Sequence, residues 1–102
     1  MNPPSVSPAE VAGDAFLLDV READEWAAGR IPGSTHVPMN TIPARSAEVP
    51  KDRDVVVVCR MGARSAQVTA YLMQLGWSNV RNLDGGVQAW SNAGKPFDGT
   101  VI

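Results

Sequence analysis

Short apolar runs alternate along the chain with stretches in which apolar residues recur at helical spacing. The runs predict strands at residues 16–20, 34–37, 54–58 and 79–83. Helices are predicted at residues 7–10, 22–28, 40–49, 64–75 and from 86 to about 94. Because strands and helices alternate, the pattern predicts an α/β fold built on a parallel sheet.

The predicted helix 64–75 carries an apolar stripe that would face the sheet. Its members recur at helical spacing and are Val68, Leu72 and Leu75. Gly76 follows at the position where a helix C-terminus favours glycine. In the helix 40–49, by contrast, Pro43 is expected to allow only a first turn or to introduce a break.

The composition is that of an ordinary globular chain of 102 residues, with 44% hydrophobic and 20% charged residues. This length predicts one domain over residues 1–102. A net charge of −2 and a pI near 5.2 argue against a nucleic-acid partner. The start of the chain lacks a basic segment followed by an apolar one, and no run approaches the ~18 apolar residues that span a membrane. Neither a secretory signal nor a membrane contact is therefore expected.

The chain holds one cysteine and one histidine, Cys59 and His36. A single cysteine cannot form an intramolecular disulfide, and these two side chains are too few for a zinc site within one chain. We therefore expect neither a metal nor a cofactor. A reducing cytoplasm is the expected compartment.

Cys59 directly follows four consecutive valines and precedes a predicted helix. Such a valine run is typical of a strand buried on both faces of a parallel sheet, and ligands bind at the C-terminal ends of these strands. The N-terminus of the next helix directs N–H groups and a positive dipole to the same place. We therefore predict a nucleophile rather than a buried structural cysteine. Gly62 would let the loop turn its N–H groups inward, and Ser65 could cap the helix or donate a hydroxyl.

The spacing from Cys59 to Arg64 is C-x4-R, one residue shorter than the C-x5-R loop of cysteine-dependent phosphatases. A phosphate-sized cradle needs the longer loop, whereas the shorter one fits a sulfur atom carried on the cysteine. Arg60 and Arg64 give the loop two cations. These charges would favour a small anionic donor.

Four segments, in order, resemble the signature segments of a single-domain rhodanese. They are residues 19–22 (DVRE), 29–34 (GRIPGS), 59–64 (CRMGAR) and 83–90 (LDGGVQAW). The resemblance covers roughly residues 5 to 97, and the tail 98–102 has no interpretable pattern. Arg30 stands where the family usually has histidine, a position that we expect to be structural.

The resemblance implies a five-stranded parallel sheet with helices on both faces, and a sulfurtransferase. Cys59 would take a sulfane sulfur from thiosulfate or a similar donor, become a persulfide, and pass the sulfur to cyanide or a thiol. The family's persulfide-binding loop would here be Arg60, Met61, Gly62, Ala63, Arg64 and Ser65. Because the chain has no second cysteine, the acceptor must be external, for example a thioredoxin-like thiol, glutathione or a sulfur-carrier protein.

Other charged residues near the same sheet edge are assigned supporting roles. Asp19 and Arg21 are expected to pair with each other, with donor collection by Arg21 as the alternative. Glu25 is expected on the helix surface or bracing the loop. His36 is expected to be packed or hydrogen-bonded, and Gly85-Gly86 to form a tight turn.

Two other classes of function fit parts of the pattern. A non-catalytic rhodanese-like module would use the anion pocket or its rim to recruit a partner, but the intact cysteine loop disfavours this interpretation. A small phosphatase or arsenate-handling enzyme is disfavoured by the short loop and by the lack of a nearby general acid.

Overall fold

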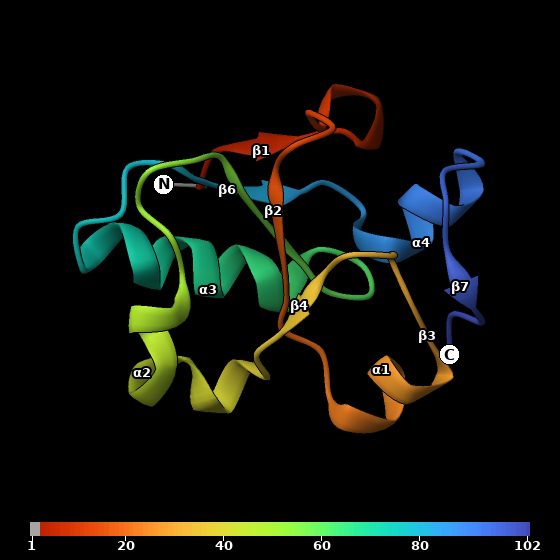
Figure 1. Ribbon diagram of the computed structural model, residues 1–102, viewed down its shortest axis with the longest axis horizontal. Helices are drawn as coiled ribbons and strands as arrows, with labels where there is room; N and C mark the ends of the chain where they lie inside the picture. Colours follow the sequence, from red (N-terminus) through yellow and green to blue (C-terminus); the bar gives the residue numbers. More distant parts are fainter. Residues whose placement is uncertain (1–2) are drawn as a thin grey trace.

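The computed structural model describes residues 3–102, and within them five strands form a parallel sheet (Figure 1). The order across the sheet is β1-β6-β5-β2-β4, and each pair of neighbours is parallel. The strands are β1 (Ser5–Val6), β2 (Phe16–Asp19), β4 (Thr35–His36), β5 (Val55–Val58) and β6 (Val80–Leu83). The predicted α/β class and the five-stranded parallel sheet are therefore confirmed.

Helices and short 3-10 turns connect the strands. They are η1 (Pro8–Glu10), α1 (Ala23–Ala28), η2 (Met39–Thr41), α2 (Ile42–Arg45), η3 (Ser46–Glu48), α3 (Ala63–Gln74) and α4 (Gly86–Asn92). The predicted helix 40–49 is thus divided into three pieces, and Pro43 lies in the first turn of α2, where its missing N–H has no helical partner to lose. Among residues 3–102, no helix combines the length and apolar character needed to cross a membrane.

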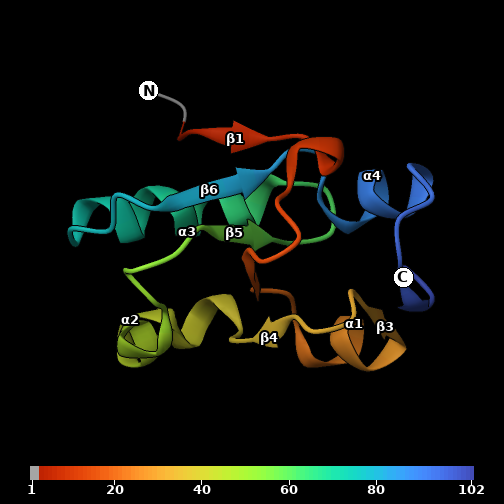
Figure 2. The same ribbon diagram turned by 45° about the horizontal axis from the view of Figure 1, so that its top comes forward.

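The central strand β5 is buried on both faces. Val55 and Val57 belong to one hydrophobic cluster, and Val56 and Val58 belong to the other, as the alternation of a strand requires. Residues of α2 and α3 complete the first cluster, and residues of α4 complete the second. Helices therefore cover both faces of the sheet. In Figure 2, β5 and β6 point toward the side of the molecule where α1 and α4 lie.

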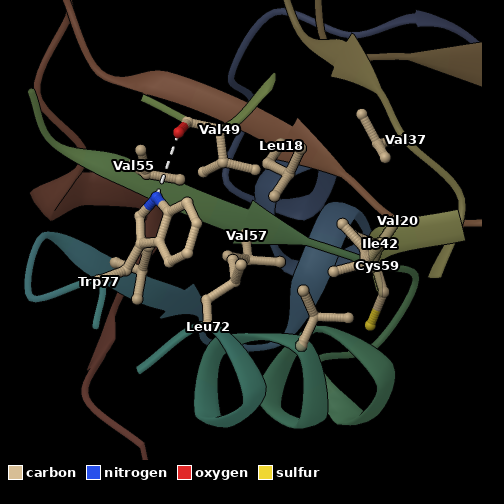
Figure 3. Close-up of a cluster of buried hydrophobic side chains, with 12 residues drawn as sticks. Leu18, Val20, Val37, Ile42, Val49, Val55, Val57, Cys59, Leu72 and Trp77 are labelled. Carbon is tan, nitrogen blue, oxygen red and sulfur yellow. Dashed lines mark hydrogen bonds between the residues drawn. The ribbon is translucent and has the colours of Figure 1, made fainter. Parts of the chain in front are cut away.

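The cluster that contains Val55 and Val57 includes two of the three residues of the predicted stripe of α3 (Figure 3). Val68 and Leu72 are buried, but Leu75 is 47% exposed, so its prediction as a core residue is wrong. The helix stops at Gln74, and the chain turns there. Trp77 fills the core instead, and its indole N–H donates to the Val49 carbonyl at 3.1 Å.

Three strands of two residues each, β1, β3 (Gly29–Arg30) and β7 (Asp98–Gly99), escaped the sequence prediction. β1 pairs with β6 at the edge of the sheet. β3 and β7 form a separate antiparallel pair. The Thr100 N–H also donates to the Ala28 carbonyl at 2.9 Å. The C-terminal segment, which has no pattern in the sequence, therefore lies against the end of α1 (Figure 1).

Candidate functional site

Cys59 lies at the C-terminal end of β5, and a short loop carries the chain from it into α3. Its side chain is buried, with 1% exposure. Gly62, the residue before α3, has φ +107°, a left-handed conformation that favours glycine. This conformation lets the loop fold back over the cysteine, so that N–H groups at the start of α3 converge on the sulfur.

The Cys59 sulfur accepts two hydrogen bonds. The backbone N–H of Gly62 donates at 3.0 Å, and the Ser65 hydroxyl donates at 3.2 Å. Ser65 is itself buried, and the Thr69 hydroxyl donates to its carbonyl at 2.7 Å. The sulfur is therefore held by donors from the loop and from the first turn of α3, the arrangement that stabilises a thiolate.

Burial and hydrogen bonding act in opposite directions on the pKa of the Cys59 thiol. Burial is the largest single influence and raises this pKa, because the thiolate loses contact with water. The Ser65 hydroxyl and the N–H groups of Ser65, Gly62 and Met61 each lower it. Together they outweigh burial, so the pKa of Cys59 lies below its ordinary value. The hydrogen-bond donors thus favour the thiolate form of Cys59 at the C-terminal end of β5.

Arg64 is bound to a carboxylate rather than left free beside the sulfur. Its Nη1 and Nη2 atoms lie 2.6 and 2.8 Å from the two oxygens of Glu25, on α1. The hydrogen bonds from Arg64 lower the pKa of Glu25 to about 2, and the same pairing raises the pKa of the Arg64 guanidinium. Glu25 therefore braces the loop, one of the two roles expected for it. A direct contact of Arg64 with a donor stays a prediction.

The outer part of the loop is more open. Met61 is 58% exposed, and Ala63 is exposed as well. Arg60 is half-buried, and its Nε donates to the Ile102 carbonyl at 2.6 Å. The C-terminal segment therefore contacts the loop as well as α1.

Asp19 and Arg21 form a fully buried ion pair. The Arg21 Nε lies 3.0 and 3.1 Å from the two Asp19 oxygens, and Nη2 lies 2.8 Å from one of them. The remaining donors of Arg21 bind the carbonyls of Gly29 at 2.7 Å and Glu25 at 3.3 Å. Because Arg21 is 0% exposed, it supports α1 and does not collect a donor from solvent. Because Arg21 binds the Glu25 carbonyl, the buried pair also helps to position the residue that binds Arg64.

His36 and Arg30 both pack on Trp26 of α1. The His36 ring stacks on the indole at 4.7 Å with an interplanar angle of 6°, and its Nε2 lies 2.8 Å from the Arg21 carbonyl. The Arg30 guanidinium lies 4.6 Å from the Trp26 ring centroid and donates to the Trp26 carbonyl at 2.8 Å. Both residues stabilise the end of α1, which agrees with the structural roles expected for them.

Residues 82–88, which run from β6 through a tight turn into the first turn of α4 and are called the β6–α4 turn below, contribute contacts that the sequence did not single out as functional. The Val87 N–H donates to the Cys59 carbonyl at 2.8 Å, and the Gln88 N–H donates to the Arg60 carbonyl at 3.1 Å. Asn82 donates from Nδ2 to the Gly62 carbonyl at 3.1 Å. The glycine pair 85–86 was visible in the sequence, but its contact with the cysteine loop depends on the fold.

Known proteins resemble this chain in sequence and in structure. Residues 8–93 match the rhodanese-like domain family. A sulfurtransferase of Allochromatium vinosum is 53% identical over 84 residues, which cover 82% of this chain and 78% of that protein. The thiosulfate sulfurtransferase GlpE of Pseudomonas savastanoi pv. phaseolicola is 36% identical over 88 residues, covering 86% and 83%. The crystal structure of a rhodanese-related protein from Thermoplasma volcanium aligns with a TM-score of 0.85 at 31% identity, covering 92% and 96%.

Proposed function

This chain belongs to the rhodanese-like domain family, and we propose that it is a sulfurtransferase that carries sulfur on Cys59. The observation that supports this most directly is the set of donors on the sulfur, where Gly62 and Ser65 bind it within a C-x4-R loop. A loop of this size encloses the cysteine sulfur closely. The relatives named sulfurtransferase and thiosulfate sulfurtransferase support the same activity.

The proposed reaction has two displacement steps at sulfur. The Cys59 thiolate attacks the outer sulfur of thiosulfate, an S–S bond forms on Cys59, the S–S bond of thiosulfate breaks, and sulfite leaves with its electron pair. An acceptor thiolate or cyanide then attacks the outer sulfur of the persulfide. The bond to Cys59 breaks, and Cys59 leaves as a thiolate. Donors that stabilise this thiolate assist both steps, because it is the nucleophile first and the leaving group second.

We propose that the sulfur acceptor is external, because Cys59 is the only cysteine in the chain. Cyanide, glutathione, a thioredoxin-like thiol or a thiol of a sulfur-carrier protein each have the required chemistry. Met61 is exposed and Arg60 half-buried in the same loop, so we propose that donor and acceptor approach the sulfur from this side. A free thiol of this kind is suited to a reducing cytoplasm, where we place the protein.

The alternatives explain less of the site. A purely binding role would not require hydrogen-bond donors aimed at the sulfur. A phosphatase needs an acid to protonate its leaving group, and Glu25 does not suit this task, because its pKa of about 2 keeps it ionised beside Arg64.

The test is sulfur loading of the reduced protein by thiosulfate, followed by intact-mass spectrometry. The wild type should gain the mass of one sulfur atom, and cyanide should remove it as thiocyanate. Cys59→Ser should gain nothing. No gain in the wild type, or an equal gain in the variant, would refute the proposal, and turnover of an aryl phosphate would favour the phosphatase instead.

A further inference from the structure

The β6–α4 turn, residues 82–88, binds carbonyl groups of the Cys59 loop. Successive carbonyls, those of Cys59 and Arg60, accept hydrogen bonds from Val87 at 2.8 Å and Gln88 at 3.1 Å. A third, that of Gly62, accepts the bond from Asn82 at 3.1 Å. The loop is therefore bound on two sides: the N–H groups of Met61 and Gly62 act on the sulfur, and the three carbonyls bind the β6–α4 turn.

Binding of the carbonyls affects the N–H groups because each peptide unit is rigid. When a carbonyl is held on one side, the N–H of the same peptide unit points to the other side. The Arg60 carbonyl shares its peptide unit with the Met61 N–H, one of the groups that act on the sulfur. Fixing the carbonyls therefore also fixes the direction of the N–H groups.

Gly86 allows the turn to approach this closely. A Cβ atom at this position would lie 2.4 Å from the carbonyl oxygens of both Cys59 and Arg60. Gly86 also has φ +62°, so its backbone is left-handed. Gly94 is a natural comparison, because it has φ +76° but a Cβ there would meet nothing within 4 Å. Any side chain at Gly86 would push the turn and the loop apart, and one at Gly94 would not.

Asn82 points to a role beyond folding. It is buried, with 8% exposure, and its Oδ1 has no hydrogen-bond partner among residues 3–102. A buried unpaired oxygen opposes folding. Its one side-chain hydrogen bond within residues 3–102 goes to the Gly62 carbonyl and so fixes the peptide unit between Gly62 and Ala63. This unit directly follows the Gly62 N–H that donates to the sulfur.

We propose that Asn82 and Gly86 are positioning residues for Cys59: they hold the loop carbonyls against the β6–α4 turn and thereby keep the loop N–H groups on the sulfur. This rests on the proposed role of Cys59 as the sulfur carrier. The activation of the thiol would then depend on the β6–α4 turn, which does not contact the sulfur.

The test is a pH titration of the thiolate by its ultraviolet absorbance, with the Cys59→Ser protein as the background. Because the chain has one cysteine, the signal reports Cys59 alone. The proteins compared are the wild type, Gly86→Ala, Asn82→Leu and Gly94→Ala. We expect Gly94→Ala to titrate with the wild type. The midpoint of the thiolate titration should move upward by about one pH unit in Asn82→Leu and by at least as much in Gly86→Ala. A rise of one pH unit means about tenfold less thiolate at a pH below both midpoints.

Asn82→Leu is the decisive variant if Gly86→Ala does not fold. It removes the unpaired oxygen together with the bond to Gly62, so we expect it to remain folded. A midpoint equal to that of the wild type would overturn the proposal. An unfolded Asn82→Leu protein would also overturn it, because Asn82 would then serve the fold rather than the sulfur. An equal rise of the titration midpoint in Gly94→Ala would overturn it as well. The titration uses no sulfur donor, so its result is independent of whether thiosulfate loads the protein.

Discussion

Two sides of the same sheet edge support the Cys59 loop by different chemistry. On the side of β2 and α1, charged side chains pair with one another, Arg21 with Asp19 and Arg64 with Glu25. On the side of β6 and α4, backbone N–H groups and one amide bind the loop carbonyls. Neutral donors, a hydroxyl and backbone N–H groups, also bind the sulfur itself.

The comparison shows that the conspicuous charges of the sequence do not act mainly on the sulfur. The partners of Arg21 and Arg64 are carboxylates, so the principal effect of these two cations is on the stability and position of α1 and the loop. The sulfur is instead stabilised by fixed dipoles that need no counter-ion. Substitutions on the charged side should therefore change stability, and substitutions of the neutral donors should change the thiol pKa.

The largest expected effect is on the buried pair. Arg21→Leu leaves the Asp19 carboxylate buried without its partner and should lower the free energy of unfolding by about 3–5 kcal/mol. Arg45→Leu breaks an exposed pair with Glu48 and should change it by at most about 1 kcal/mol. Urea denaturation measures both. Equal losses would contradict the distinction between buried and surface pairs.

The brace between Glu25 and Arg64 should give a smaller effect that depends on pH. The pKa of Glu25 is about 2 in the folded protein and is ordinarily 4.5, so the carboxylate adds stability above pH 4.5 and loses it as the pH falls toward 2. Since Arg64 is one-third exposed, we expect Glu25→Gln to lower the free energy of unfolding by about 1–2 kcal/mol at pH 7. The difference from the wild type should vanish near pH 2, as followed by denaturation across this range. The exposed Asp24, on the same helix, provides the control Asp24→Asn. A difference that does not change with pH would argue against the ion pair.

Ser65→Ala should leave stability almost unchanged and alter the thiol. Removing the hydroxyl takes away one of the donors on the sulfur, so the pKa of Cys59 should rise by about one unit. The ultraviolet titration measures this change, and Ser78→Ala, at an exposed serine, is the matched control. If the two variants titrate alike, the hydroxyl does not stabilise the thiolate.

The smallest effect on the thiol should come from neutralising the brace completely. In the double variant Glu25→Gln with Arg64→Gln, two opposite charges disappear together, so their effects on the sulfur largely cancel. The same titration should show a smaller rise in the pKa of Cys59 than Ser65→Ala does. A larger rise would mean that the cation, rather than the neutral donors, controls the sulfur.

The core and the cysteine loop could be predicted because their signals are local in the sequence. The four valines of β5 are buried on both faces, as a central parallel strand requires, and Cys59 follows them directly. β1, β3 and β7 could not be predicted, because each has only two residues and none was part of a longer run that indicated a strand. Leu75 continues the helical spacing of α3, but spacing alone does not reveal that the helix has ended.

The partners of the loop could not be read from the sequence because they are distant in it. Glu25 and Arg64 are 39 positions apart, and Asn82 lies 20 positions after Gly62. Gly85 and Gly86 were recognised as a turn, but the close approach of Gly86 to the Cys59 carbonyl depends on the order of β5 and β6 in the sheet. The residue types indicated Cys59 as the candidate nucleophile, and the fold shows which residues support its loop.

The most direct test of the central claim is thiosulfate loading of the wild type measured by intact mass as a function of pH. If Cys59 is a sulfur carrier activated by neutral donors, the initial rate at which the protein gains one sulfur atom should rise with pH. It should reach half of its maximum below about pH 8.5, the pKa of an ordinary thiol. A gain that appears only above that pH, or no gain at any pH, would contradict the account.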